Sequence, residues 1–252
     1  MDFDLTDEQR LLKESVDRLV ADRYAFEDRR RYAQEPEGFS RAVWGQYAEL
    51  GLLGLPFAEE HGGFGGGAVE TMIVMEAFGR ALALEPYLAT VILGGSFLRH
   101  GASEAQRAEL IPQIAAGELT LAFAHTERQS RFDLFDVATA ARPSGSGFVI
   151  NGQKSVVLNG DSAAKFIVSA RMSGERRDRS GITLFIVDAK APGVEVHGYE
   201  AQDGQRVAEL TLNDVSVQAK AVLGEPDKGL AVLEAAIDRA CSSATIMSTA
   251  SC

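Results

Sequence analysis

Two segments of the chain place polar residues at the end of an apolar run, where side chains can act on a bound molecule. The first, Leu121–Asp133, alternates apolar and small residues and becomes polar at Thr126-Glu127, with two arginines and an aspartate following. The second, Lys154–Gly160, is largely apolar and closes with Asn-Gly. Either segment alone is also typical of a strand that ends in a polar loop, so neither by itself predicts a reaction.

Other patterns that commonly support chemistry are weak or missing in this sequence. The four histidines are scattered and lack the spacing of metal ligands, so no metal site is predicted. No Gly-x-Ser-x-Gly motif is present, which leaves a hydrolase triad unsupported. The glycine-rich run His61–Gly67 follows Glu59-Glu60 and lacks the lysine of a phosphate-binding loop. It is therefore more typical of a connection between helices.

The composition restricts the partners and the compartment that we expect. There are 36 acidic against 25 basic side chains, a formal net charge of −11, which disfavours binding to nucleic acids or anionic membranes. The amino terminus is charged from the second residue, and no apolar run approaches the roughly 18 residues of a membrane span. Cys241 and Cys252 cannot by themselves form a disulfide framework. We expect a soluble, cytoplasmic protein with no nucleic-acid or membrane partner.

Residues 1–117 have the patterns of an N-terminal all-α helical domain. Thr6 with Gln9, and Ser103 with Gln106, form capping boxes, in which each side chain of the pair bonds the other residue's backbone amide at a helix start. Apolar residues recur at helical spacing in several segments. These segments are residues 12–20, 43–50, 69–82 and 110–114.

Residues 118–226 have the period-two alternation that is typical of strands. The strongest hairpin signal is Asn151-Gly152, which suits a type I′ turn between Phe148–Ile150 and Lys154–Val157. The segment Gly174–Gly181, GERRDRSG, is typical of a solvated turn. Further strands are predicted at residues 166–170, 182–187, 194–199 and 209–212.

Near Lys228 the pattern becomes helical again, which defines a third unit over residues 227–252. Separate runs of helices and of strands argue for an α+β fold and against an alternating α/β fold. A helix that begins so near the terminus would have little to pack against. We therefore expect that the chain stops within a C-terminal helical domain of which it holds only the start.

Together and in this order, the two polar-ended segments resemble the acyl-CoA dehydrogenase family. Phe123–Asp133 follows the frame of the family's first flavin motif, aromatic-small-Val-Thr-Glu-Pro-Gly-Ala-Gly-Ser-Asp. Gly152–Gly160 aligns with the second, Gly-x-Lys-x-Trp-Ile-Thr-Asn-Gly. The resemblance covers residues 2–241, and DGQRVAELTL and KSVVLNG look most like the small-subunit branch typified by pimeloyl-CoA dehydrogenase.

The family resemblance implies a fold and a reaction. It implies a helical N-terminal domain, an antiparallel, barrel-like middle β domain and a helical C-terminal domain, with FAD at their junction. A carboxylate base removes the α-proton of an acyl-CoA thioester, and the β-hydrogen passes as hydride to the flavin. Such a site needs donors that polarise the thioester carbonyl and a base within hydrogen-bond reach of the α-proton. The flavin carries the redox chemistry and the protein orients it.

The implied FAD contacts lie in both motifs. They are Phe123, His125, Thr126, Asp133, Val156, Val157 and Leu158. Thr126 and Asp133 are retained from the family pattern, whereas His125 stands in place of a valine. Val156 stands in place of the flavin-stacking tryptophan, and Leu158 in place of a threonine near flavin N5. Many flavin contacts in the family are made by the backbone, so the resemblance still implies that this stretch lines the ring.

The implied substrate contacts lie in the loop of the first motif and in the last helix. They are Arg128, Arg131, Phe132, Asp238 and Arg239. The two loop arginines are typical either of solvated charge or of contacts to a CoA phosphate. Phe132 stands where the family has a hydrogen-bonding serine. In one branch the catalytic glutamate lies on the last helix, at the position of Ala240 here. In the other branch it lies in the C-terminal domain, so we assign no catalytic base.

We therefore interpret the chain as an FAD-dependent acyl-CoA dehydrogenase that is incomplete or inactive by itself. The implied partners are an acyl-CoA substrate, an acceptor like electron-transfer flavoprotein, and either further copies of the chain or a second acyl-CoA dehydrogenase subunit. One alternative is a non-catalytic partner or scaffold subunit of such a complex. The other is a related flavin oxidase or monooxygenase, which would differ in its reactivity with oxygen.

Overall fold

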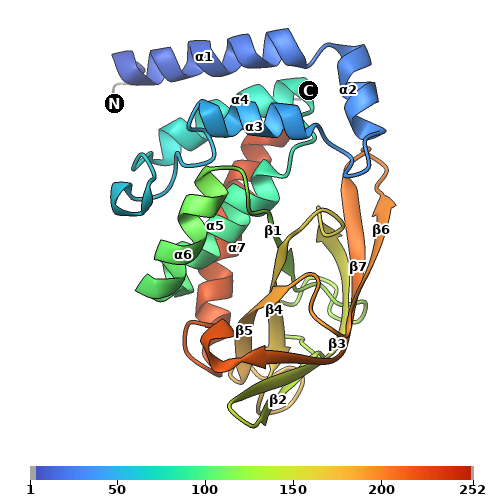
Figure 1. Ribbon diagram of the computed structural model, residues 1–252. Helices are drawn as coiled ribbons and strands as arrows, with labels where there is room; N and C mark the ends of the chain where they lie inside the picture. Colours follow the sequence, from blue (N-terminus) through green and yellow to red (C-terminus); the bar gives the residue numbers. More distant parts are fainter. Residues whose placement is uncertain (1–3, 251–252) are drawn as a thin grey trace.

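The computed structural model describes residues 4–250, and Figure 1 shows helices on one side of the molecule and a sheet on the other. The predicted order of helices, then strands, then a helix is confirmed. The helical side consists of α1 (Asp7–Arg23), α2 (Phe26–Ala33), α3 (Arg41–Glu49), η1 (Glu59–His61), α4 (Ala68–Ala81), η2 (Leu88–Gly94), α5 (Gly95–Gly101) and α6 (Glu104–Ala115).

Both capping boxes predicted from the sequence are present. The Gln9 amide donates to Thr6 Oγ1 over 3.2 Å and the Thr6 amide donates to Gln9 Oε1 over 3.0 Å, at the start of α1. Ser103 and Gln106 make the same exchange at the start of α6. Each box satisfies two amides that have no partner inside their helix, which fixes where the helix begins.

The middle part of the chain is one open, eight-stranded sheet. Its strands are β1 (Leu121–Ala124), β2 (Ala140–Ser144), β3 (Gly147–Leu158), β4 (Lys165–Arg171), β5 (Ile182–Asp188), β6 (Val194–Glu200), β7 (Arg206–Gln218) and β8 (Val222–Leu223), with the short turn η3 (Ala219–Ala221) before β8. They lie in the order β6-β7-β3-β2-β4-β5-β8, with β1 beside β4. Most pairs are antiparallel as expected, but β1 pairs with β4 in parallel and the sheet does not close into a barrel.

The predicted hairpin turn at Asn151-Gly152 is wrong. The chain reverses at Gly145-Ser146, and β3 then runs without a break through both residues. Asn151 has a different role from that of a turn residue. Its side chain donates to the Asp214 carboxylate and accepts from the Asp214 amide on β7, at a shift in the β3–β7 register. Gly152 is required there for a different reason, since a Cβ atom would overlap Thr139.

The helix α7 (Gly229–Ala250) joins the two sides of the molecule. It contacts α4, α5 and η2 on the helical side and β5 of the sheet, and Figure 1 shows it in red behind the green helices. Leu233 and Ala236 are fully buried. Gly79 lets α4 approach so closely that a Cβ atom there would overlap the backbone oxygen of Met247. The expectation that this helix has little to pack against is therefore wrong.

Two apolar clusters support this arrangement. The larger one fills the space between the helices and reaches Ile182 and Leu184 on one face of the sheet. The smaller one lies among the strands and includes Val157 and Phe166. Trp44 closes the larger cluster between α6 and β1, where its indole N–H donates to the Gly117 carbonyl over 3.0 Å. Between residues 4 and 250, no helix is both long enough and apolar enough to cross a membrane.

Candidate functional site

A cavity of about 320 Å³ lies where the sheet, the loop after β1 and α7 meet. We call it the junction cavity. Its walls are largely apolar and come from η2, the end of β1, the following loop, the end of β3 and α7. They are formed by Leu88, Ala89, Leu93, Phe123, His125, Thr126, Ser130, Arg131, Phe132, Asp133, Leu134, Val156, Leu158, Ile237, Ala240, Cys241 and Ala244.

The junction cavity brings together most of the residues predicted to contact FAD. Those on its wall are Phe123, His125, Thr126, Asp133, Val156 and Leu158. The rings of Phe123 and His125, which both line the cavity, lie nearly parallel and stacked, with their centroids 5.3 Å apart. Val157 does not line the cavity, because alternation along β3 directs its side chain into the apolar cluster of the sheet.

Two residues of the cavity wall have an unusual backbone. Val156 has φ +52° and a side chain that is 54% exposed, and Arg131 has φ +51°. A left-handed conformation is rare for any residue other than glycine and is a true outlier for a β-branched one. It persists only where the surroundings hold it, and such strain gathers at functional sites. Next to Arg131, the Phe132 side chain is 97% exposed at the cavity rim.

Only some of the residues predicted to contact substrate line the junction cavity. Arg131 and Phe132 lie on the cavity wall. Arg128 does not, because its guanidinium pairs with Glu209 on β7 over 2.9 Å and 3.0 Å. Asp238 and Arg239 lie on α7 next to the wall but are not part of it. The next two residues, Ala240 and Cys241, line the cavity, and Ala240 is the position that the resemblance aligns with a glutamate of one branch.

A buried ion pair lies directly behind the cavity wall. The Lys154 Nζ atom is 2.7 Å from Glu127 Oε1, and the two side chains are 0% and 3% exposed. Burial lowers the pKa of Lys154 to about 8, although the Glu127 charge acts against this. Burial raises the pKa of Glu127, but the Lys154 charge and several hydrogen bonds outweigh it and bring the pKa to about 2. Both groups are therefore charged at neutral pH.

His125 is neutral mainly because it is buried, and the ion pair is in contact with its surroundings. Burial, together with the nearby Lys154 charge, lowers the pKa of His125 to about 3, so the ring is neutral. Lys154 donates to the Ser169 hydroxyl over 3.1 Å, and that hydroxyl lies 2.8 Å from His125 Nδ1. Since Ser169 accepts from the ammonium, its own proton is available to His125 Nδ1. The cavity thus presents a neutral, fixed imidazole face.

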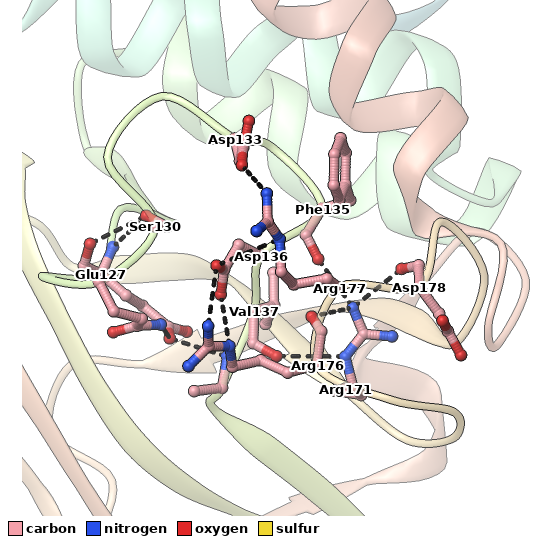
Figure 2. Close-up of polar contacts among 12 residues, drawn as sticks. Glu127, Ser130, Asp133, Phe135, Asp136, Val137, Arg171, Arg176, Arg177 and Asp178 are labelled. Carbon is pink, nitrogen blue, oxygen red and sulfur yellow. Dashed lines mark hydrogen bonds and ion pairs between the residues drawn. The ribbon is translucent and has the colours of Figure 1, made fainter.

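Arg171 organises the loops on the far side of the cavity wall. Figure 2 shows its guanidinium among backbone carbonyls of two loops, the one between β1 and β2 and the one between β4 and β5. It donates to the carbonyl oxygens of Phe135, Val137, Ser173, Arg176, Asp178 and Ser180. One side chain therefore ties the segment that follows the cavity-lining loop to the arginine-rich turn at residues 174–181.

The arginine-rich turn is also attached through its own side chains. Arg177 bonds Asp133 of the cavity wall and Arg176 pairs with the buried Asp136 over 2.9 Å (Figure 2). Arg179 reaches α7, where it bonds Glu234 over 2.6 Å. The sequence predicted only a solvated turn here. The run of basic residues was the available signal, but its acidic partners Asp136 and Asp133 lie 40 and 44 positions away along the chain.

The glycine-rich run between η1 and α4 does not form an anion site. The Gly67 amide at the start of α4 donates to the Glu70 carboxylate over 2.7 Å, so a negative charge already occupies this helix terminus. The run is a connection between helices, as the sequence predicted. Over residues 4–250, no group of histidine, cysteine, aspartate or glutamate side chains is arranged to hold a metal ion.

Comparison with known proteins identifies the two main parts of the chain. Residues 6–118 match the profile of the acyl-CoA dehydrogenase N-terminal domain, and residues 122–215 match that of the acyl-CoA dehydrogenase middle domain. The chain is 31% identical to the acyl-CoA dehydrogenase FadE12 of Mycobacterium tuberculosis, over 92% of its own length and 60% of that protein. It is 37% identical to the mouse mitochondrial long-chain specific acyl-CoA dehydrogenase, over 75% and 45%.

Solved structures show the same fold. A glutaryl-coenzyme A dehydrogenase in complex with glutaryl-CoA superimposes with a TM-score of 0.91 at 23% identity, covering 99% of this chain and 65% of that one. Butyryl-CoA dehydrogenase from Megasphaera elsdenii gives a TM-score of 0.89 at 24% identity, covering 99% and 67%. The chain spans about three fifths of the length of curated relatives such as FadE12. From its two matched domains and this fold, the chain belongs to the acyl-CoA dehydrogenase family.

Proposed function

We propose that the junction cavity is the flavin and acyl-thioester site of an FAD-dependent acyl-CoA dehydrogenase. The observation that carries the proposal is that two distant segments of the chain line the same cavity. Two segments that resemble the family's flavin motifs, one after β1 and one in β3, meet on one cavity although they are distant in sequence. Apolar walls with a few polar groups are the usual make-up of a cofactor site.

The chemical character of the walls fits a flavin ring. The stacked faces of Phe123 and His125, the exposed Val156 side chain and Leu158 give a planar heterocycle apolar surface to lie against. Thr126 is exposed to the cavity and offers a hydroxyl. When bound, FAD supplies the redox chemistry, taking up the hydrogen that leaves the β-carbon of the acyl group. The protein residues orient the reactants and exclude water.

The cavity wall explains why we assign no catalytic base. Among the described residues, Asp133 supplies the only carboxylate of the wall, and that carboxylate is bonded to Arg177. Ala240, on the opposite side, has no proton-accepting group. The described part of this wall therefore offers no free carboxylate as a base for the α-proton. An electron acceptor like electron-transfer flavoprotein completes the proposed cycle.

The alanine at position 240 favours a second candidate function. In it, the chain is the non-catalytic member of a hetero-oligomer and contributes the junction cavity to a partner that supplies the base. Solved structures with the same fold include one described as the ChsE4-ChsE5 complex from Mycobacterium tuberculosis, at 25% identity and a TM-score of 0.84. That complex consists of two differently named proteins, and at this identity the likeness to this chain concerns the fold.

Anaerobic mixing with acyl-CoA thioesters separates the two candidates. A dehydrogenase would lose flavin absorbance with saturated acyl-CoA thioesters once the FAD-loaded chain is extended by a C-terminal helical domain that supplies the base. A non-catalytic subunit would bind FAD and keep its absorbance until a partner subunit is added. A chain that binds no FAD at all would contradict the proposal in both forms.

A further inference from the structure

The Lys154–Glu127 ion pair contacts nearly every segment that forms the sheet side of the junction cavity. Lys154 Nζ donates to the carbonyl of His125 over 3.2 Å as well as to Glu127 and Ser169. Glu127 Oε1 and Oε2 accept from the Thr139 and Ala138 amides over 3.0 Å and 2.8 Å. The pair thus links the end of β1, β3, β4 and the entry to β2.

The loop that carries the cavity residues is tied to the same centre. The Glu127 amide donates to Ser130 Oγ over 3.2 Å, and Ser130 Oγ donates to the Glu127 carbonyl over 2.9 Å (Figure 2). Next to Lys154, the Ser155 amide donates to the Thr126 carbonyl over 2.8 Å. Ser130 and Thr126 are both wall residues. Their positions therefore depend on backbone segments that the ion pair holds.

A contribution to the free energy of folding does not by itself explain why this ion pair is buried. Removing two charges from water is costly, and well-packed apolar residues often serve a core as well or better. Directly after it, the β3–β7 register shifts between Lys154 and Val157, and Val156 takes its left-handed conformation. A strained residue of this kind persists only if its neighbours over-determine it. Lys154 lies two residues before Val156 and is fixed by all its donor contacts.

We propose that Lys154 and Glu127 are positioning residues that pre-order the cavity wall, through the bulge at Val156 and the loop from Thr126 to Ser130, for the flavin ring. Neither residue is on the wall itself, and Lys154 is fully buried, so the pair acts through other residues and does not touch a ligand. The inference rests on the proposed function, since it names the group for which the wall is ordered.

The decisive variant is Lys154→Met combined with Glu127→Gln. Lys154→Met alone leaves an unpaired buried carboxylate and is expected to unfold the chain. Glutamine at 127 keeps one acceptor oxygen, for either the Ala138 or the Thr139 amide, and leaves no buried charge. The double variant is therefore expected to fold while losing the link between β1 and β3. The matched control is Arg142→Gln, which removes an exposed ion pair between Arg142 on β2 and Asp214 on β7.

FAD titration monitored by flavin absorbance gives the first measurement. The double variant is expected to bind FAD about tenfold to a hundredfold more weakly than the unmodified chain, because small misplacements at a pre-ordered site cost binding and rate steeply. Its bound flavin is also expected to show a less structured absorption band. The affinity of the Arg142→Gln control for FAD is expected to stay within about twofold of the unmodified chain. Equal affinity and band shape in the double variant would overturn the proposal.

Hydrogen exchange at the Ser155 amide gives a second measurement that needs no flavin. That amide bonds Thr126 and not the mutated side chains, so its protection reports the order of the wall. It is expected to exchange faster in the double variant than in the control, and unchanged protection would overturn the positioning role. If the unmodified chain binds no FAD, the proposed function fails, while this exchange experiment still decides whether the pair orders the wall.

Discussion

At the scale of single residues, the cavity wall is defined by conformations that no side-chain pattern reveals. Val156 is β-branched and exposed, yet it has a left-handed backbone at the point where β3 bulges. Its neighbour Val157 alternates back into the sheet core. The difference between the two valines, one on the wall and one in the core, arises from pairing with β7 and not from their side chains.

Replacing Val156 with glycine is expected to stabilise the fold. A left-handed conformation costs an L-residue about 1–2 kcal/mol, which glycine avoids. Part of this stabilisation is offset because glycine loses more conformational entropy on folding. We expect Val156→Gly to raise the free energy of unfolding in denaturant by about 0.5–1 kcal/mol. The control is Val196→Gly on β6, an exposed valine without a positive φ, which is expected to lower it. A loss of stability at both positions would argue against strain at Val156.

The Glu127 carboxyl is expected to make the free energy of unfolding fall more steeply at acid pH, which gives the stability curve a distinct acid limb. Its folded-state pKa is lowered to about 2 by Lys154 and its hydrogen bonds, acting against burial. The unfolded chain therefore binds more protons between about pH 2 and pH 4.5. The contribution of Glu127 to the free energy of unfolding is fully present above about pH 4.5 and is lost as the pH falls toward 2. Urea unfolding over this range should show a shallower acid limb in Lys154→Met/Glu127→Gln. Identical limbs in the two proteins would contradict the assigned charges.

At the scale of elements, short-range signals predicted structure well and long-range pairing overrode one of them. Thr6–Gln9 and Ser103–Gln106 were predicted correctly because a capping box is complete within four residues. Asn151-Gly152 was not, because its role depends on Asp214 in a strand far along the chain. The Lys154–Glu127 pair is similarly beyond sequence reasoning, since its two members lie 27 positions apart and either reads as a solvated charge.

The crossing of α4 and α7 gives a test at this scale. Gly79→Ala would push its Cβ atom into the Met247 backbone, so α7 would have to move and the free energy of unfolding is expected to fall by about 1–3 kcal/mol. Gly45→Ala on α3 is the matched control, because nothing lies within 4 Å of the added atom. It is expected to raise the free energy of unfolding by about 0.5–1 kcal/mol, as usual for glycine to alanine within a helix. A tolerated Gly79→Ala would mean that the two helices are not in close contact.

At the scale of the whole molecule, the sequence predicted the order of the elements and the family, but not how the elements pack to form the cavity. The succession of helices, strands and a last helix follows from periodicity alone. The open sheet, the parallel β1–β4 pair and the packing of α7 between both sides depend on contacts between distant segments. Those contacts create the junction cavity, so a sequence pattern can identify its residues but cannot arrange them.

The central claim is that the junction cavity holds a flavin. It is tested most directly by denaturing the purified chain and measuring the FAD released per mole of protein, with an intact mass from the same sample. We predict close to one FAD per chain after loading with excess FAD and removal of the unbound portion. A chain of confirmed mass that retains its fold and releases no FAD would contradict the claim.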